Sequence, residues 1–185
     1  TENPTVNVLG IDNKQAGRLA AETLVARGYK SVGFLGGPEA ATSTQDRMAG
    51  FLAALETHPD VQCTASFASQ YSFEAGRVEM LRLMDGPLAD AYFCGDDVLS
   101  VGALSALQTR GLLVPSDVGI IGLNDMEMAG WENINLTTIH NPIGDIIASS
   151  VNLVADIVQD HSLGPQARMF DCHVVDRGTL RPLKG

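Results

Sequence analysis

Short runs of apolar and β-branched residues alternate along the chain with segments in which apolar residues recur every three or four positions. The runs are typical of strands, and the helical spacing is typical of helices that cover one face of a sheet. The pattern predicts strands at 6–9, 31–35, 61–66, 90–94, 118–122 and 136–139, and one or two strands within 169–175. Strands that alternate with helices of this length form βαβ units. We therefore expect an α/β fold with a parallel sheet and helices on both of its faces.

Capping signals delimit the predicted helices. Asp12, with Gln15 three residues later, is typical of a capping-box start, and Gly28 predicts the end of the first helix. Ser43 followed by Asp46 marks a similar start of the second helix. Further helices are predicted at 72–84 and 97–110. A long last helix begins at Asn141-Pro142 and carries an apolar stripe of Ile147, Val151, Val154 and Val158.

The net charge of the 185-residue chain is −10. Surfaces that bind DNA are usually basic, because phosphate contacts supply much of the affinity, so we do not expect this segment itself to hold DNA. No apolar run approaches the roughly 20 residues that cross a bilayer. The first residues show neither the basic start nor the apolar core of a secretion signal. We expect a cytoplasmic protein with no membrane partner.

Sequence signatures of enzymes are lacking. A nucleophile elbow, a zinc-protease helix and a phosphate-binding loop with its lysine do not occur, and the four histidines are scattered. Cys63, Cys94 and Cys172 match neither a metal-binding spacing nor a disulfide framework, and we interpret them as free thiols in a reducing compartment. The sequence thus favours a binding module over an enzyme and predicts neither a cofactor nor a metal site.

The most distinctive segments lie near the carboxyl ends of the predicted strands, where doubly wound sheets bind ligands. STQDRMAGFLAAL (43–55) resembles the "R..GF..AL" helix of lactose-repressor (LacI/GalR) family regulators. DAYFCGDDVLSVGALSALQTRGLLVPSDVGIIGLND (90–125) resembles the family's "F..ND..A.G...AL...G..VP.D" run that leads to "V.I.G.DD". LTTIHNP (136–142) and VVDRGT (174–179) resemble its "LTTI" crossover and closing "V.R.ST". Each motif alone is weak, but their order and spacing hold over almost all of the chain.

The resemblance implies a periplasmic-binding-protein type I fold, in which two doubly wound lobes are joined by three crossovers and a small effector binds in the cleft. It implies that residues 31–139 plus 167–175 form the carboxyl-terminal lobe, and that 6–27 plus 142–160 are a remnant of the amino-terminal lobe. That lobe would be incomplete here, and the family's helix-turn-helix has no counterpart in this sequence. Apolar helix faces in the remnant would lack a sheet to cover, so we expect the sequence to be part of a longer chain.

Three residues at the strand ends are the main candidates for effector contacts. The family's effectors are sugars, polyols and related molecules, whose adjacent hydroxyls suit a planar guanidinium and carboxylate or amide acceptors. Arg47 matches the family's effector-contacting arginine, with a surface pair to Asp46 as the alternative. Asp96 stands where the family usually has Asn, and Asn124 where it usually has Asp. A carboxylate at 96 only accepts hydrogen bonds, which favours ligand hydroxyls or an amine, and it could pair with Arg47.

Five further residues have weaker signals. Tyr71 follows a strand where the family often places an aromatic ring that stacks on the sugar, with loop packing as the alternative. Ser43 is either a ligand contact or, as we favour, a helix cap; Asn141 is a cleft residue, an N-cap or both. Asp97 is the better candidate than Asp96 for capping the following helix. Trp131 lies in a loop that the family commonly places at the dimer interface.

These expectations combine into one functional hypothesis. The sequence predicts the effector-binding domain of a LacI-type transcription regulator, with a homodimer as its assembly and DNA bound only through an amino-terminal helix-turn-helix. One alternative is a periplasmic solute-binding protein of a sugar transporter, which would share the fold and the cleft. Another is a small α/β enzyme that uses the carboxylates at the strand ends.

Overall fold

A six-stranded sheet forms the centre of the computed structural model, which describes residues 5–183. Its strands are β2 (Ser31–Gly36), β3 (Gln62–Phe67), β4 (Ala91–Cys94), β5 (Gly119–Asn124), β6 (Thr138–His140) and β8 (His173–Val175). They lie in the order β3-β2-β4-β5-β6-β8, and every pair is parallel except the antiparallel β6–β8 pair at the edge. The predicted doubly wound, parallel α/β architecture is confirmed. The order reverses between β2 and β4, which is where such sheets bind ligands.

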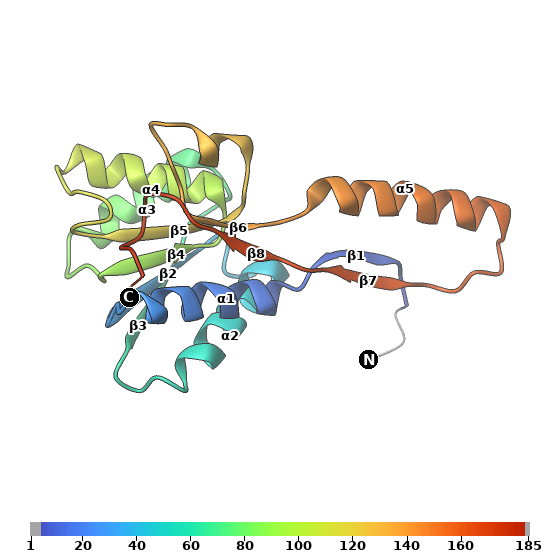
Figure 1. Cartoon of the computed structure of the whole chain (residues 1–185), viewed down its shortest axis with the longest axis horizontal. Helices are drawn as coiled ribbons and strands as arrows, with labels where there is room; N and C mark the ends of the chain where they lie inside the picture. The colour runs from blue at the N-terminus through green and yellow to red at the C-terminus, as the bar shows by residue number, and fades with distance from the viewer. Residues whose placement is uncertain (1–4, 184–185) are drawn as a thin grey trace.

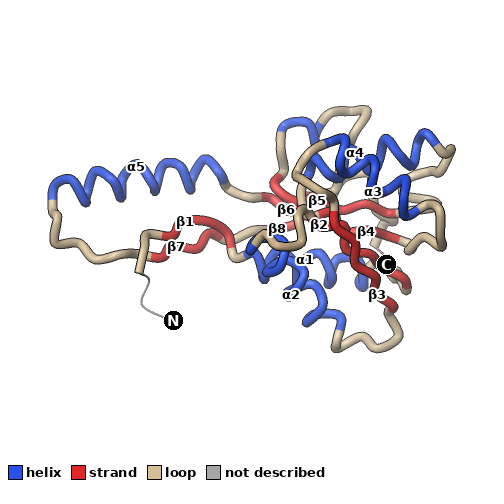
Figure 2. Tube along the Cα trace, turned by 180° about the vertical axis from the view of Figure 1, so that it is seen from behind, coloured by secondary structure: helices blue, strands red, loops and turns tan. Residues whose placement is uncertain are grey.

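Helices cover both faces of this sheet. α1 (Asn13–Ala26) and α2 (Thr42–Leu55) lie on one face, and α3 (Phe73–Leu83) and α4 (Asp97–Thr109) lie on the other (Figure 2). The first face is filled by Phe34, Phe51 and Phe93, whose ring centroids are 5.6–6.1 Å apart. Apolar side chains of α3, α4, β4 and β5 form a second core on the opposite face. We call this sheet with its four helices the large lobe.

A smaller part, which we call the arm, extends away from the large lobe (Figure 1). It consists of α5 (Ile143–Gln159) and a two-stranded parallel sheet of β1 (Val8–Ile11) and β7 (Ala167–Phe170). Three chain segments connect the two parts, after β1, after β6 and after β7. Ile146 and Leu153 are the buried residues of α5, whereas the predicted stripe of Ile147, Val151, Val154 and Val158 is 57–65% exposed.

Two segments lie elsewhere than the sequence predicts. α1 packs on the large sheet, because Ala16, Ala20 and Leu24 bury their side chains in the same core as Phe34; it is not part of the remnant formed with 142–160. β7 pairs with β1 in the arm and not with the large sheet, so only β8 of the 167–175 segment joins the large lobe. The remaining lobe assignments stay a prediction. Within residues 5–183, no helix is both long and apolar enough to cross a bilayer.

Candidate effector-binding site

A hollow of about 790 Å³ lies between the ends of β4 and β5 and the start of α5. The large lobe and the segment that leads into the arm both contribute to its lining. The lining residues are Tyr71, Asp96, Val98, Asn124, Asp125, Met126, Glu127, His140, Asn141, Pro142, Ile143, Gly144 and Asp145. Four of the candidates from the sequence are therefore in one place: Tyr71, Asp96, Asn124 and Asn141. The rule that ligands bind beyond the strand ends explains why residues so far apart in the sequence come together.

A chain of hydrogen bonds links three of these residues. Asn124 donates from Nδ2 to Asp96 Oδ2 at 2.6 Å, and its Oδ1 accepts from Asn141 Nδ2 at 3.1 Å. Asp96 follows β4, Asn124 ends β5 and Asn141 lies in the crossover to α5. The chain thus connects two strand ends of the large lobe with a segment that carries the arm.

Asp96, and not Asp97, caps α4. Asp96 Oδ1 accepts from Val98 N at 2.7 Å, so one oxygen of this carboxylate caps the helix while the other binds Asn124. Burial raises the pKa of Asp96, against the lowering effect of its hydrogen bonds and of Arg47. The prediction that Asp97 is the cap was wrong, because Asp97 is already the first helical residue and is buried, which leaves Asp96 as the N-cap.

Arg47 lies beside the hollow but does not line it. Its Nη1 donates to Gly95 O at 2.6 Å and its Nε donates to Asn13 Oδ1 at 2.8 Å, so it joins α2 to the β4 end and to α1. Among the described residues, none accepts a hydrogen bond from Nη2 of Arg47. Burial lowers the pKa of Arg47, and the charges of Tyr71 and Asp96 oppose that effect. The alternative pair of Arg47 with Asp46 does not form. The Asp46 carboxylate pairs instead with Lys14, whose Nζ lies 4.0 Å away.

Tyr71 lies over the loop that follows β2. Its Oη is 2.6 Å from Thr44 Oγ1, and a Cβ at Gly37 would fall 2.3 Å from the ring, so only glycine leaves room for it. Ser43 does not cap α2, because the helix starts at Thr42 and its cap residue, Ala41, has no side-chain acceptor. The Ser43 hydroxyl is instead 3.4 Å from Tyr71 Oη. Asn141 is no helix cap either, and α5 begins without a side-chain cap.

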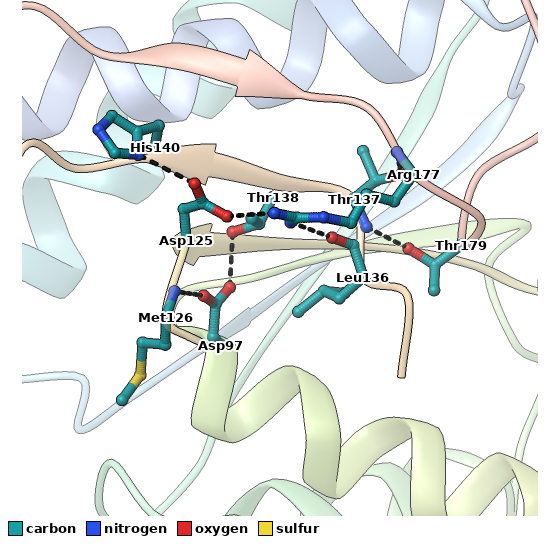
Figure 3. A network of polar contacts seen from close by, with 9 residues as sticks. All are labelled: Asp97, Asp125, Met126, Leu136, Thr137, Thr138, His140, Arg177 and Thr179. Carbon is teal, nitrogen blue, oxygen red and sulfur yellow. Dashed lines mark hydrogen bonds and ion pairs between the residues drawn. The ribbon is translucent and has the colours of Figure 1, made fainter. Parts of the chain in front are cut away.

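A second polar network includes Asp125 and His140 of the lining, and sequence reasoning missed it. The Asp125 carboxylate lies between His140 and Arg177 (Figure 3), 3.0 Å from His140 Nδ1 and 2.6 Å from Arg177 Nη2. Arg177 also donates to Leu136 O at 2.8 Å. Burial pushes the pKa of Asp125 upward, but hydrogen bonds from Arg177 and His140 outweigh it and hold the pKa below its ordinary value. The "DR" of the closing motif was the available signal for Arg177, but it does not name a partner.

The backbone at Asn124 and Asp125 adopts positive φ values of 115° and 54°. Residues with a side chain rarely occupy this region, although Asn and Asp tolerate it better than most. Both residues line the hollow, and strained backbone of this kind is retained where the surrounding contacts enforce it. Here the Asp125 pairs and the Asn124 hydrogen bonds supply those contacts.

Asp97 is a buried carboxylate behind the hollow, where it accepts from Thr138 Oγ1 at 2.6 Å and from Met126 N at 2.8 Å (Figure 3). Burial raises the pKa of Asp97 to about 6, although both hydrogen bonds oppose the shift. In the unfolded chain its pKa returns towards the ordinary 3.8. Between these two values the folded protein keeps a proton that the unfolded chain has lost, so rising pH favours unfolding.

We therefore expect Asp97 to lower the free energy of unfolding by about 2 kcal/mol as the pH rises from 4 to 6. The Asp97→Asn variant keeps an acceptor oxygen but does not titrate. The measurement is urea unfolding of both proteins across this interval, with the wild type losing more stability than the variant. Parallel curves would show that Asp97 is not the group responsible.

Trp131 is 54% exposed and lies just after the 3₁₀ helix η1 (Glu127–Gly130), outside the lining of the hollow; its interface role stays a prediction. In the part of the chain that the structure describes, no group of three His, Cys, Asp or Glu side chains is arranged to hold a metal ion.

Comparison with known proteins identifies the family of this chain. The family described as periplasmic binding protein-like domain matches residues 21–180. The chain belongs to this family. Among curated proteins, the HTH-type transcriptional repressor CytR of Escherichia coli strain K12 is 34% identical over 189 aligned residues, which cover 98% of this chain and 53% of the repressor. The periplasmic binding protein-like chain thus spans about half the length of the curated relatives it matches.

Solved structures of LacI-type regulators also match this chain. A LacI family transcriptional regulator from Enterococcus faecium with bound ribose is 26% identical with a TM-score of 0.86, over 94% of this chain and 65% of that one. A dimeric Lac repressor is 25% identical with a TM-score of 0.83, over 93% of this chain and 64% of that one. The resemblance to the effector-binding domain of LacI/GalR regulators is confirmed.

Proposed function

We propose that this periplasmic binding protein-like chain is the effector-binding domain of a LacI-type transcription regulator and that its hollow binds a sugar, polyol or related small molecule. The observation that carries the proposal is the Asp96–Asn124–Asn141 hydrogen-bond chain, which lines the hollow and spans from strand ends to a crossover. A relative is named as an HTH-type repressor, and a structural neighbour contains bound ribose. Both support the proposal.

The position of the hollow suggests how a bound effector could act at a distance. Asp96 and Asn124 belong to the large lobe, whereas Asn141 and Asp145 lie at the start of the arm. A molecule that contacts both groups stabilises one relative position of the two parts over the others. An effector with such differential affinity shifts the equilibrium between global states, which is the thermodynamic requirement for allostery.

Several parts of the regulator's activity lie outside the hollow. We assign DNA contact to a helix-turn-helix beyond this domain, because the net charge of −10 does not suit a phosphate-binding surface. We assign a homodimer, with the exposed Trp131 in its interface, and a place in the cytoplasm, where a transcription regulator meets DNA. Binding without turnover is the role we assign to the site.

The test is a thermal-shift screen of the full-length protein against sugars, polyols and sugar acids. A molecule that binds the folded state raises the melting temperature according to its concentration relative to its Kd. We expect Arg47→Ala to weaken binding of any hit by about tenfold or more, because the guanidinium that holds Gly95 O, next to Asp96, is lost. Arg18→Ala is the matched control, because Arg18 forms only an exposed pair with Glu22. An unchanged thermal shift in Arg47→Ala would show that Arg47 has no part in effector binding.

A further inference from the structure

The hydrogen bonds of the Asp96–Asn124–Asn141 chain have a fixed direction. Both oxygens of Asp96 already accept from donors, Oδ1 from Val98 N and Oδ2 from Asn124 Nδ2. Because a carboxylate offers no hydrogen, Asn124 must turn its Nδ2 towards Asp96 and its Oδ1 towards Asn141. Asn141 must then donate from its Nδ2 to this oxygen of Asn124. An asparagine at 96, the usual residue in LacI-type regulators, would allow the chain to run in either direction.

This direction leaves one acceptor without a partner. Asn141 Oδ1 is buried and accepts no hydrogen bond from any residue between 5 and 183. A buried acceptor without a donor is unfavourable, and Asn141 lines the hollow at the entrance to the arm. A small rotation of the Asn141 amide brings this oxygen to the hollow, where a bound molecule that carries a donor can satisfy it and one that carries only acceptors cannot.

The charges around the hollow also favour a ligand that donates hydrogen bonds and carries a positive charge. Asp96, Asp125, Glu127 and Asp145 all line it, and the imidazole of His140 is its only basic side chain. Arg177 pairs with Asp125, and the positive charge of Arg47, which lies outside the lining, acts on Asp96. The exposed carboxylates of Glu127 and Asp145 remain and make the hollow negative. Such a hollow attracts cationic ligands and repels anionic ones.

We propose that the effector carries a primary amino group beside its hydroxyls, as in an amino sugar or amino polyol, and that Asp96 sets this preference. The inference rests on the proposed effector-binding function and narrows it. A protonated amine supplies up to three N–H donors and one positive charge, which match the unpartnered Asn141 acceptor and the lone pairs that remain on the carboxylates lining the hollow. Sugar acids, which add a negative charge and further acceptors, are then the poorest ligands of the polyhydroxylated class.

The experiment is isothermal titration calorimetry of the full-length protein with matched compounds. The pairs are glucosamine against glucose and glucamine against sorbitol, with gluconate as the acid, at mildly acidic pH where the amines are protonated. We expect each amine to bind about tenfold more tightly than its neutral partner, the advantage of a charge-assisted hydrogen bond, and gluconate to bind most weakly.

Two variants assign the preference to the hydrogen-bond chain. Asp96→Asn keeps an effective helix cap but frees the direction of the chain, so the amine preference should disappear. Asn141→Ala removes the unpartnered acceptor from a different segment and should reduce the same preference. Glu74→Gln is the control for net charge, because Glu74 is exposed on α3, forms its ion pair with Arg77 and lies outside the hollow. It should keep the tenfold preference of the wild type.

The outcomes separate this inference from the proposed function. If neutral compounds or gluconate bind as tightly as the amines, the inference fails and the effector-binding function stands. An amine preference that survives in both Asp96→Asn and Asn141→Ala also overturns it. If no compound of either class binds, the inference fails together with the assignment of the hollow to polyhydroxylated effectors. Should Asp96→Asn fail to fold, Asn141→Ala alone decides.

Discussion

Replacing Gly50 by alanine will lower the free energy of unfolding by about 3 kcal/mol, the upper end of the usual cost of overpacking. A Cβ at Gly50 would lie 1.9 Å from Lys14 O and 2.7 Å from Lys14 C. Both atoms belong to the backbone of α1 and cannot rotate away, so α1 and α2 would have to separate. α1 covers the core of the large sheet through Ala16, Ala20 and Leu24, which makes any separation costly.

The matched control for this prediction is Gly144→Ala. Gly144 is also helical, but nothing lies within 4 Å of a Cβ at this position. Alanine there should leave stability unchanged or raise it by about 0.5–1 kcal/mol, because alanine is the better helix former. Guanidinium unfolding of both variants gives the comparison. Equal stabilities of Gly50→Ala and the wild type would mean that α1 and α2 are not in backbone contact.

The contact between α1 and α2 also shows the limit of pattern reading for the fold. Helical spacing predicted both helices, and Gly28 ends the first of them with a φ of 76° as expected. The same spacing does not say which surface an apolar face covers. The family resemblance assigned residues 6–27, which include α1, to the amino-terminal lobe, but α1 packs on the large sheet. Its small side chains, with Gly17 and Gly50 at the crossing, suit close packing against α2, but only three-dimensional coordinates identify that partner.

One rule of sheet geometry explains why several of the predicted contact residues line one hollow, although Arg47 lies beside it; that these residues bind an effector stays a prediction. Strand ends brought Tyr71, Asp96 and Asn124 together as expected, because parallel strands end at the same edge. Local capping rules could not separate Asp96 from its neighbour Asp97, since both residue types suit an N-cap and the choice depends on where the helix starts. The pairs of Asp125 with His140 and Arg177 could not be predicted, because no local pattern links residues so far apart in the sequence.

Removing the Arg177 guanidinium should destabilise the protein by about 3 kcal/mol and weaken effector binding as well. Arg177→Ala deletes the donors to Asp125 Oδ1 and to Leu136 O, which lie in a largely buried network. Losing one partner of such a pair costs roughly 3–5 kcal/mol when it is fully buried, and partial exposure here reduces the figure. Asp125 sits at a φ of 54°, next to Asn124 at 115°, so loss of its main anchor also frees the backbone that presents Asn124.

Two comparisons make this prediction specific. Arg77→Ala breaks the exposed pair with Glu74 at 3.8 Å, whose worth is about 0–1 kcal/mol, and serves as the control in urea unfolding. Arg177→Lys keeps the charge but not the planar fork that reaches Asp125 and Leu136 O together, so it should recover only part of the stability. Calorimetric titration with the best ligand of the screen measures the expected loss of effector affinity in Arg177→Ala. Full stability and unchanged affinity in Arg177→Ala would show that the left-handed turn at Asn124 and Asp125 is held by other contacts, and the network of Asp125, His140 and Arg177 would then have no part in shaping the hollow.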